Sequence, residues 1–165
     1  MRIDIVAVGR LRDPALRSLA TRYRERLPWR IREIELAPAE GSPEMRRRRE
    51  GEGLLARSRG RRRLVLDPRG EVLDSPGFAR LLARGGRPPA FLIGGPEGLD
   101  DAVRAAAERV VAFGPMTWPH ELVRVMLLEQ IYRAWAILAG HPYHRDAAGP
   151  STATAGAVSS ATHAR

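Results

Sequence analysis

The chain has 165 residues, 44% of them hydrophobic, which is enough for one domain with a buried core. It has no cysteine, which excludes disulfides, thiolate metal sites and a cysteine nucleophile. All 28 basic residues are arginine, and with 19 acidic residues they give a net charge of +9. This balance indicates either a polyanionic partner, with nucleic acid as the first candidate, or a soluble protein with arginine-rich helix faces.

Neither apolar run of the sequence has the form of a targeting or membrane segment. The run near the amino terminus, residues 5–8, is too short for a signal peptide and follows Asp4 directly. The run at 122–138 contains three charged residues and a glutamine, which a membrane span would not tolerate. We therefore expect a cytoplasmic protein without a membrane anchor.

Strand and helix patterns alternate five times along the chain. Helix starts are predicted at Asp13-Pro14, Ser42-Pro43 and Asp74-Ser75-Pro76, where a capping side chain precedes a proline in the first turn. Gly9, Pro28, Gly85-Gly86 and Gly140 are predicted to end elements. Strands are expected at 3–8, 31–36, 64–66, 90–93 and 110–113, and helices at 14–27, 43–57, 75–84, 100–109 and 119–139. This order predicts an α/β domain with a mostly parallel sheet.

The last predicted helix is apolar on nearly every side, which indicates burial on all sides. One face can pack on the sheet, and the other needs a partner, most simply a second copy of the chain. Arg124 and Arg133 would be costly in such a helix unless paired. Glu121 and Glu129 stand at the spacing that allows pairing along the helix.

Two glycine- and proline-rich loops follow predicted strands, "FLIGGPEGLD" at 91–100 and "FGPMTWPHE" at 113–121. In parallel sheets ligands bind at the carboxyl ends of strands, so the two loops can form one cleft if their strands are neighbours. The glycine spacing matches neither a dinucleotide-binding motif nor a P-loop. From spacing alone, tight connections without a ligand explain both loops equally well.

The stretch "GHPYHR" at 140–145 follows the long helix. His141 and His144 are too few for a metal site, because the remaining histidines, His120 and His163, are remote in sequence. We predict no metal. Gly140 reads as a helix cap, and the alternatives for the polar residues are a solvated flank or part of an active site.

Three motifs together resemble one family. They are "LIGGPEGL" at 92–99, "PHELVRVMLLEQIYRAW" at 119–135 and "HPYHR" at 141–145, and "VLDPRG" at 65–70 fits as well. In this order and spacing they resemble the RlmH family of 23S rRNA pseudouridine N3-methyltransferases, which belongs to the SPOUT superfamily. The resemblance covers residues 1–145 and implies an α/β domain with a parallel sheet and a C-terminal trefoil knot.

The resemblance also implies a cofactor, a partner and a substrate. The cofactor is S-adenosyl-L-methionine, and the matching positions for its contacts are Leu66, Gly95, Gly114, Pro115, Met116, Thr117, Trp118 and Pro119. The implied assembly is a homodimer. The implied reaction is methylation of N3 of pseudouridine 1915 in helix 69 of 23S rRNA on the assembled ribosome.

The catalytic residues implied by the resemblance are Tyr143, His144 and Arg145. We expect His144 to assist deprotonation of the imide or to orient it, Arg145 to hold base or phosphate, and Tyr143 to stack or hydrogen-bond. They would act at the entrance of a cofactor pocket, either that of the same chain or that of the partner subunit.

Two features depart from the family pattern. Trp118 stands where a smaller aliphatic residue is expected, and residues 146–165, rich in Ala, Ser, Thr and Gly, follow the last motif as a predicted disordered tail. Two alternatives stay open: a non-catalytic RNA- or ribosome-binding protein on the same scaffold, or a methyltransferase of another RNA site.

Overall fold

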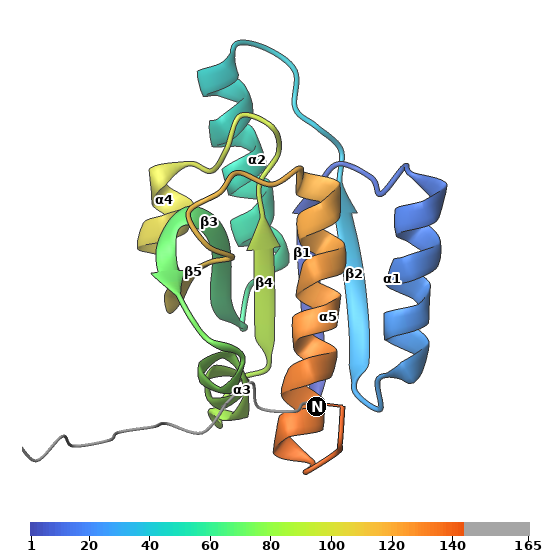
Figure 1. Cartoon of the computed structure of the whole chain (residues 1–165). Coiled ribbons are helices and arrows are strands. Elements are labelled where there is room, and N and C mark those ends of the chain that lie inside the picture. Colours follow the sequence, from blue (N-terminus) through green and yellow to red (C-terminus); the bar gives the residue numbers. More distant parts are fainter. Residues whose placement is uncertain (144–165) are drawn as a thin grey trace, which may run out of the picture.

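The structure is a computed structural model, and it describes residues 1–143. Within these residues five strands form one sheet in the order β2-β1-β4-β3-β5, and every hydrogen-bonded pair is parallel (Figure 1). The strands are β1 (Arg2–Val8), β2 (Arg30–Leu36), β3 (Arg62–Val72), β4 (Pro89–Ile93) and β5 (Arg109–Ala112). The prediction of an α/β domain with a parallel sheet is confirmed, and all five strands end at one edge.

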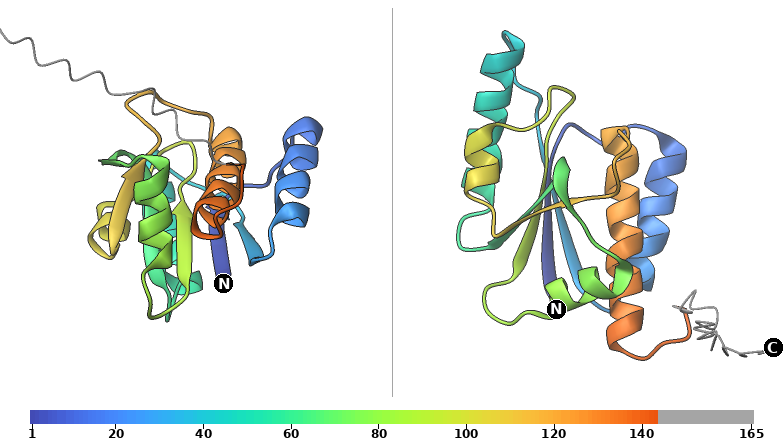
Figure 2. Two further views of the ribbon diagram at one scale, coloured as in Figure 1. Left: turned by 60° about the horizontal axis from the view of Figure 1, so that its bottom comes forward. Right: turned by 60° about the vertical axis from the view of Figure 1, so that its left-hand side comes forward.

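Helices cover both faces of this sheet (Figure 2). They are α1 (Pro14–Arg26), α2 (Pro43–Arg57), α3 (Ser75–Ala83), α4 (Asp101–Ala105) and α5 (His120–Leu138). On one face α5 packs between α1 and α3, over a core that includes Ile5 and Phe91. On the other face α2 and α4 pack together over a smaller core that includes Val6 and Leu92. Alternate residues of β1 and β4 thus enter opposite cores, as the period of a strand requires.

The predicted helix starts are confirmed by their capping bonds. A carboxylate oxygen of Asp13 accepts a hydrogen bond from the N–H of Leu16 at 2.9 Å, and Asp74 accepts one from Gly77 at 2.6 Å. Ser42 caps α2 in the same way. Each bond satisfies an N–H group that the first helical turn leaves without a partner.

Strand β3 is longer than predicted, because pairing with β5 resumes after an interruption. The register shifts between Leu66 and Glu71, where Asp67 accepts a hydrogen bond from the N–H of Arg69 and Pro68 has no N–H to offer. A Cβ at Gly70 would lie 2.7 Å from the backbone of β5, so only glycine lets the two strands approach there. A local bulge therefore replaces the predicted strand end at Asp67-Pro68.

Helix α4 is shorter than predicted, with five residues instead of the expected run from 100 to 109. After Ala105 the chain turns tightly, and the N–H of Glu108 donates to the carbonyl of Arg63 at 2.8 Å. This bond joins the chain to β3, so β5 begins at Arg109, one residue earlier than predicted. Tertiary pairing here outweighs the helical preference of the alanine run.

The tail at 146–165 lies outside the described residues, and the trefoil knot stays a prediction. None of the helices in residues 1–143 combines the length and apolar character that crossing a membrane requires.

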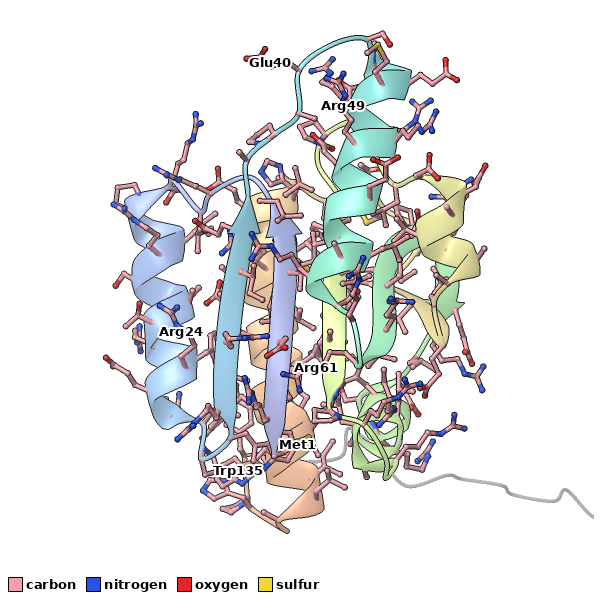
Figure 3. The ribbon with its side chains drawn as sticks, turned by 180° about the vertical axis from the view of Figure 1, so that it is seen from behind. Met1, Arg24, Glu40, Arg49, Arg61 and Trp135 are labelled. Carbon is pink, nitrogen blue, oxygen red and sulfur yellow. The ribbon has the colours of Figure 1, made fainter. Side chains whose placement is uncertain are left out.

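Asp4 is a fully buried carboxylate on β1 that is neutralised by arginines. The guanidinium of Arg32 binds both of its oxygens, at 3.1 and 2.7 Å, and Nε of Arg61 lies 2.9 Å from Oδ2 (Figure 3). The partners come from β2 and from the turn before β3. A buried charge of this kind is tolerated only because it is paired.

We expect Asp4→Asn to destabilise the fold by about 2–3 kcal/mol, since it leaves two arginines without their carboxylate. The measurement is the free energy of unfolding in urea. Glu52→Gln is the matched control, because Glu52 pairs with Arg48 on the exposed surface and such a pair contributes under about 1 kcal/mol. Equal losses in the two variants would contradict the structural role of Asp4.

Candidate functional site

A pocket of about 350 Å³ opens at the carboxyl edge of the sheet. Its walls come from the bulge of β3 at 66–68, from the ends of β4 and β5 with the loops that follow them, and from the start of α5. Figure 1 shows these strand ends and the start of α5 at one edge of the sheet. Its size lies within the range of small-molecule sites. Apolar side chains form much of the lining, including Leu66, Ile93, Leu99, Val111 and Val123.

Seven of the eight predicted cofactor-binding positions line this pocket: Leu66, Gly95, Gly114, Met116, Thr117, Trp118 and Pro119. The eighth, Pro115, belongs to the same loop but is not part of the lining. The two glycine-rich loops do form one cleft, although not at neighbouring strands as the sequence suggested. Strand β3 lies between β4 and β5, so its bulge at 66–68 lines the pocket between the loops.

The loop after β4 is a tight turn held against α2. The N–H of Gly98 donates to the carbonyl of Gly95 at 3.0 Å, and Gly98 adopts a positive φ of 81° that favours glycine. Arg46 of α2 pairs with Glu97 at 2.6 Å. A Cβ at Gly95 would lie 3.0 Å from Oε2 of Glu50 and 3.1 Å from a methyl group of Val8. Close packing behind the loop therefore requires glycine at this position.

The loop after β5 folds over the other side of the pocket. The indole N–H of Trp118 donates to the carbonyl of Phe113 at 3.2 Å, which closes the loop on itself. Trp118 thus both lines the pocket and ties the loop. Met116, by contrast, is 65% exposed at the rim.

Asp67 is a charged group in the pocket wall that the sequence analysis did not single out. Burial by itself would raise its pKa. The N–H and guanidinium of Arg69 and the guanidinium of Arg104, at 3.0 Å, outweigh burial and hold the pKa of Asp67 below its ordinary value. The carboxylate therefore stays ionised at neutral pH. Its position directly after Leu66 in "VLDPRG", where the sequence predicted a strand end, was the available signal.

The start of α5 joins the pocket to the loop after β1. His120, a second lining residue that the sequence analysis left out, would lie 3.5 Å from a Cβ on Gly9. The carboxylate of Glu121 accepts hydrogen bonds from the N–H groups of Arg12 and Asp13, at 2.8 and 3.1 Å. The loop at 9–13 is therefore fastened to the end of the pocket loop.

The pairing of the two helix arginines was predicted correctly in one case only. Arg133 pairs with Glu129 at 2.6 Å, as the helical spacing indicated. Arg124 does not pair with Glu121. Its buried guanidinium binds Glu33 at 2.6 Å and Glu35 at 2.9 Å, because these carboxylates at the end of β2 face the helix.

Tyr143 does not line the pocket of its own chain. It follows the carboxyl end of α5, whereas the pocket meets the amino end, and its side chain turns back only as far as Glu129, about 14 Å along the helix from His120 at 1.5 Å per residue. The phenol oxygen lies 3.3 Å from the carboxylate of Glu129, and the ring packs edge-on against Tyr132. His144 and Arg145, the other predicted catalytic residues, lie outside the described residues.

Metal-binding side chains do not gather anywhere in residues 1–143: no group of three or more His, Cys, Asp or Glu is placed to hold an ion. His120 and His141 stand at opposite ends of α5.

Comparison with known proteins gives a consistent family. Residues 1–144 match a family model described as "Predicted SPOUT methyltransferase". A protein of Gluconacetobacter diazotrophicus is 49% identical over 145 residues, which cover 86% of this chain and 95% of the relative. Proteins of Rhodospirillum centenum and Xanthobacter autotrophicus are 46% and 49% identical, each covering 88% of this chain and 99% of the relative. All three relatives are named ribosomal RNA large subunit methyltransferase H.

Tyr143 generates a prediction about alkaline pH. Burial of the phenol, together with the nearby carboxylate of Glu129, raises its pKa to about 12. Its unfolded pKa is about 10, so its contribution to stability is complete below pH 10 and is lost as the pH rises towards 12. The chain has neither lysine nor cysteine, so tyrosines dominate the titration in this window.

We expect the free energy of unfolding to fall by about 1–2 kcal/mol between pH 10 and 12, and to fall less in Tyr143→Phe. Chemical denaturation at a series of pH values measures both proteins. Equal losses in the two would contradict the assignment to Tyr143.

Proposed function

The chain belongs to the SPOUT methyltransferase family, and on this basis we propose that it methylates N3 of pseudouridine 1915 in helix 69 of 23S rRNA. The substrate would be the assembled ribosome in the cytoplasm, and the methyl donor S-adenosyl-L-methionine. The observation that carries the proposal is the convergence of seven predicted cofactor positions, remote in sequence, on one pocket. The names of the relatives, all ribosomal RNA methyltransferases, support the class of substrate.

The chemistry of the pocket suits this cofactor. Apolar side chains such as Leu66, Leu99 and Val111 can enclose an adenine ring, and the backbone of Gly95 is open to close approach. The cofactor carries two positive charges, on its sulfonium and its ammonium group. Asp67 supplies an ionised carboxylate in the same wall, already oriented by Arg69 and Arg104. We assign Asp67 to the recognition of one of these charges.

S-adenosyl-L-methionine supplies an electrophilic methyl group, so the protein has to align the nucleophile and remove one proton. Alignment is the task of the stiff loops around the pocket, where a displacement of 1 Å is costly. Trp118 stiffens one loop through its bond to Phe113, and Arg46 stiffens the other through Glu97. The N3–H of the pseudouridine must be lost to a base, and His144 is our candidate.

The proposed catalytic residues reach a pocket only if two copies of the chain combine. Within one chain Tyr143 does not line the pocket, and its phenol lies at Glu129, about 14 Å along α5 from the first residue of that helix. An antiparallel arrangement of two α5 helices about a two-fold axis would bring the end of one helix to the start of the other. Each active site would then contain the pocket of one subunit and residues 143–145 of its partner.

The outer face of α5 supports such a dimer. Leu122, Met126 and Ile137 share this face by helical periodicity and are only partly buried within the chain, and Leu138 beside them is 45% exposed. Arg133 and Glu129 on the same face are already paired with each other. An apolar stripe with an internally neutralised ion pair can be buried against a second copy without a large desolvation penalty.

We expect Gly95→Ala to weaken binding of S-adenosyl-L-methionine by roughly 10- to 100-fold, because overpacking costs about 1–3 kcal/mol. Calorimetry measures the affinity, and mass mapping of 23S rRNA measures methylation of helix 69. Gly85→Ala is the matched control, since nothing lies within 4 Å of a Cβ there. Wild-type protein that binds no cofactor, or that leaves helix 69 unmodified in a strain lacking the native enzyme, would overturn the proposed function.

Mixing two impaired variants tests the shared active site, at a cofactor concentration that saturates the wild-type pocket but not that of Gly95→Ala. In a dimer of Gly95→Ala with His144→Ala, one site carries both defects and the other carries neither. If subunits exchange freely, we expect about a quarter of wild-type methylation to return. Activity that does not rise above the sum of the separate variants would place each site within a single subunit.

A further inference from the structure

A second hollow, separate from the cofactor pocket, lies between the start of α1 and the end of β2. Its volume is about 660 Å³. We call it the arginine groove, and its lining consists of Arg10, Leu11, Arg12, Arg17, Glu35, Leu36, Ala37 and Pro38. Nothing in the proposed methyl transfer uses these residues.

The arginines of this groove differ from most others in the chain. Arg24, Arg32, Arg46, Arg61, Arg62, Arg104, Arg109, Arg124 and Arg133 all bind a carboxylate. Within residues 1–143, the guanidinium groups of Arg10, Arg12 and Arg17 make no hydrogen bond or ion pair. All three residues are exposed. Three guanidinium groups that have no partner within residues 1–143 therefore line one concave surface.

The single carboxylate of the groove cannot neutralise these arginines. Oε1 of Glu35 already accepts hydrogen bonds from the N–H of Leu11 at 3.0 Å and from the guanidinium of Arg124 at 2.9 Å. Burial opposes ionisation of Glu35, but these bonds, with the charge of Arg10 nearby, hold its pKa below the ordinary value. Its charge is therefore present at neutral pH and committed to Arg124.

The groove is connected to the cofactor pocket through the loop at 9–13 and the start of α5. The loop at 9–13 carries two of the arginines, and Glu121 fastens this loop to the start of α5 through the N–H groups of Arg12 and Asp13. One residue before Glu121, His120 lines the pocket and lies against Gly9. A chain of phosphates in the groove would thus pass directly beside the pocket.

We propose that the arginine groove binds the phosphate backbone of the rRNA next to the nucleotide that is methylated. This inference rests on the proposed function. Guanidinium forks bind phosphate oxygens in pairs, and such contacts set the position of a nucleic acid without reading its sequence. The groove thereby sets the register of the RNA, and the pocket and the partner's residues act on the base.

The test compares three double variants in binding to purified ribosomes at a series of salt concentrations. For Arg10→Gln with Arg17→Gln we expect a roughly tenfold loss of affinity at low salt. The slope of log affinity against log salt should fall by about 1.4 to 1.8, for two lost phosphate contacts. Cofactor affinity and thermal unfolding should stay unchanged. Arg10→Lys with Arg17→Lys keeps both charges and should restore most of the slope.

The matched control removes two other exposed arginines, as Arg59→Gln with Arg87→Gln. These residues precede β3 and β4, at the opposite edge of the sheet, and make no hydrogen bond or ion pair through their side chains in residues 1–143. If Arg10→Gln with Arg17→Gln loses no more affinity and no more salt dependence than this control, the arginine groove does not bind the phosphate backbone. This conclusion holds even when the wild-type protein methylates ribosomes normally. Wild-type protein that neither binds nor methylates ribosomes overturns the proposed function, and this inference with it.

Discussion

The buried guanidinium of Arg124 holds together the parts of the molecule on which function depends. It projects from α5 and binds Glu33 and Glu35 at the carboxyl end of β2. Removing a charge from water is costly, so the helix can occupy its place only where these two carboxylates meet the arginine. The position of α5 determines where its first residues stand, and these residues form one wall of the cofactor pocket and anchor the loop at 9–13. A single ion-pair cluster therefore aligns the pocket with the arginine groove.

In a parallel sheet all strands end at the same edge, and in this chain both the pocket and the arginine groove lie at that edge. The bulge of β3 and the loops after β4 and β5 enclose the pocket, and the segments after β1 and β2 border the groove. The strand order makes the two sites adjacent, since β1 lies beside both β2 and β4. Arginine is suited to such a surface, because it remains charged when partly buried and pairs with either carboxylate or phosphate. The paired arginines stabilise the fold, whereas the unpaired ones remain available to a partner.

Much of the fold was predictable because its information is local. Capping residues followed by proline located three helix starts, and alternating apolar residues located the strands. The errors arose where distant contacts decide. Helix α4 stops early because Glu108 binds the backbone of β3, and β3 continues past Pro68 because β5 accepts it again. Arg124 pairs with two carboxylates of β2, and the spacing of residues along the helix could not have predicted this pairing. Asp67 and His120 were missed at the site although both belong to the quoted motifs, because a motif does not show which of its side chains reach the pocket.

The sequence by itself determined the fold class, the starts of the helices and, through three motifs in order, the family and seven of the positions around the pocket. These are properties of short segments or of residue identity, so they can be predicted without knowing the tertiary structure. Only the tertiary structure decided which charged groups are already paired and which remain free. It also decided that Tyr143 packs against the middle of α5 and does not line the pocket of its own chain. Both depend on segments far apart in the chain, because packing and ion pairing, not sequence spacing, set the distances between them.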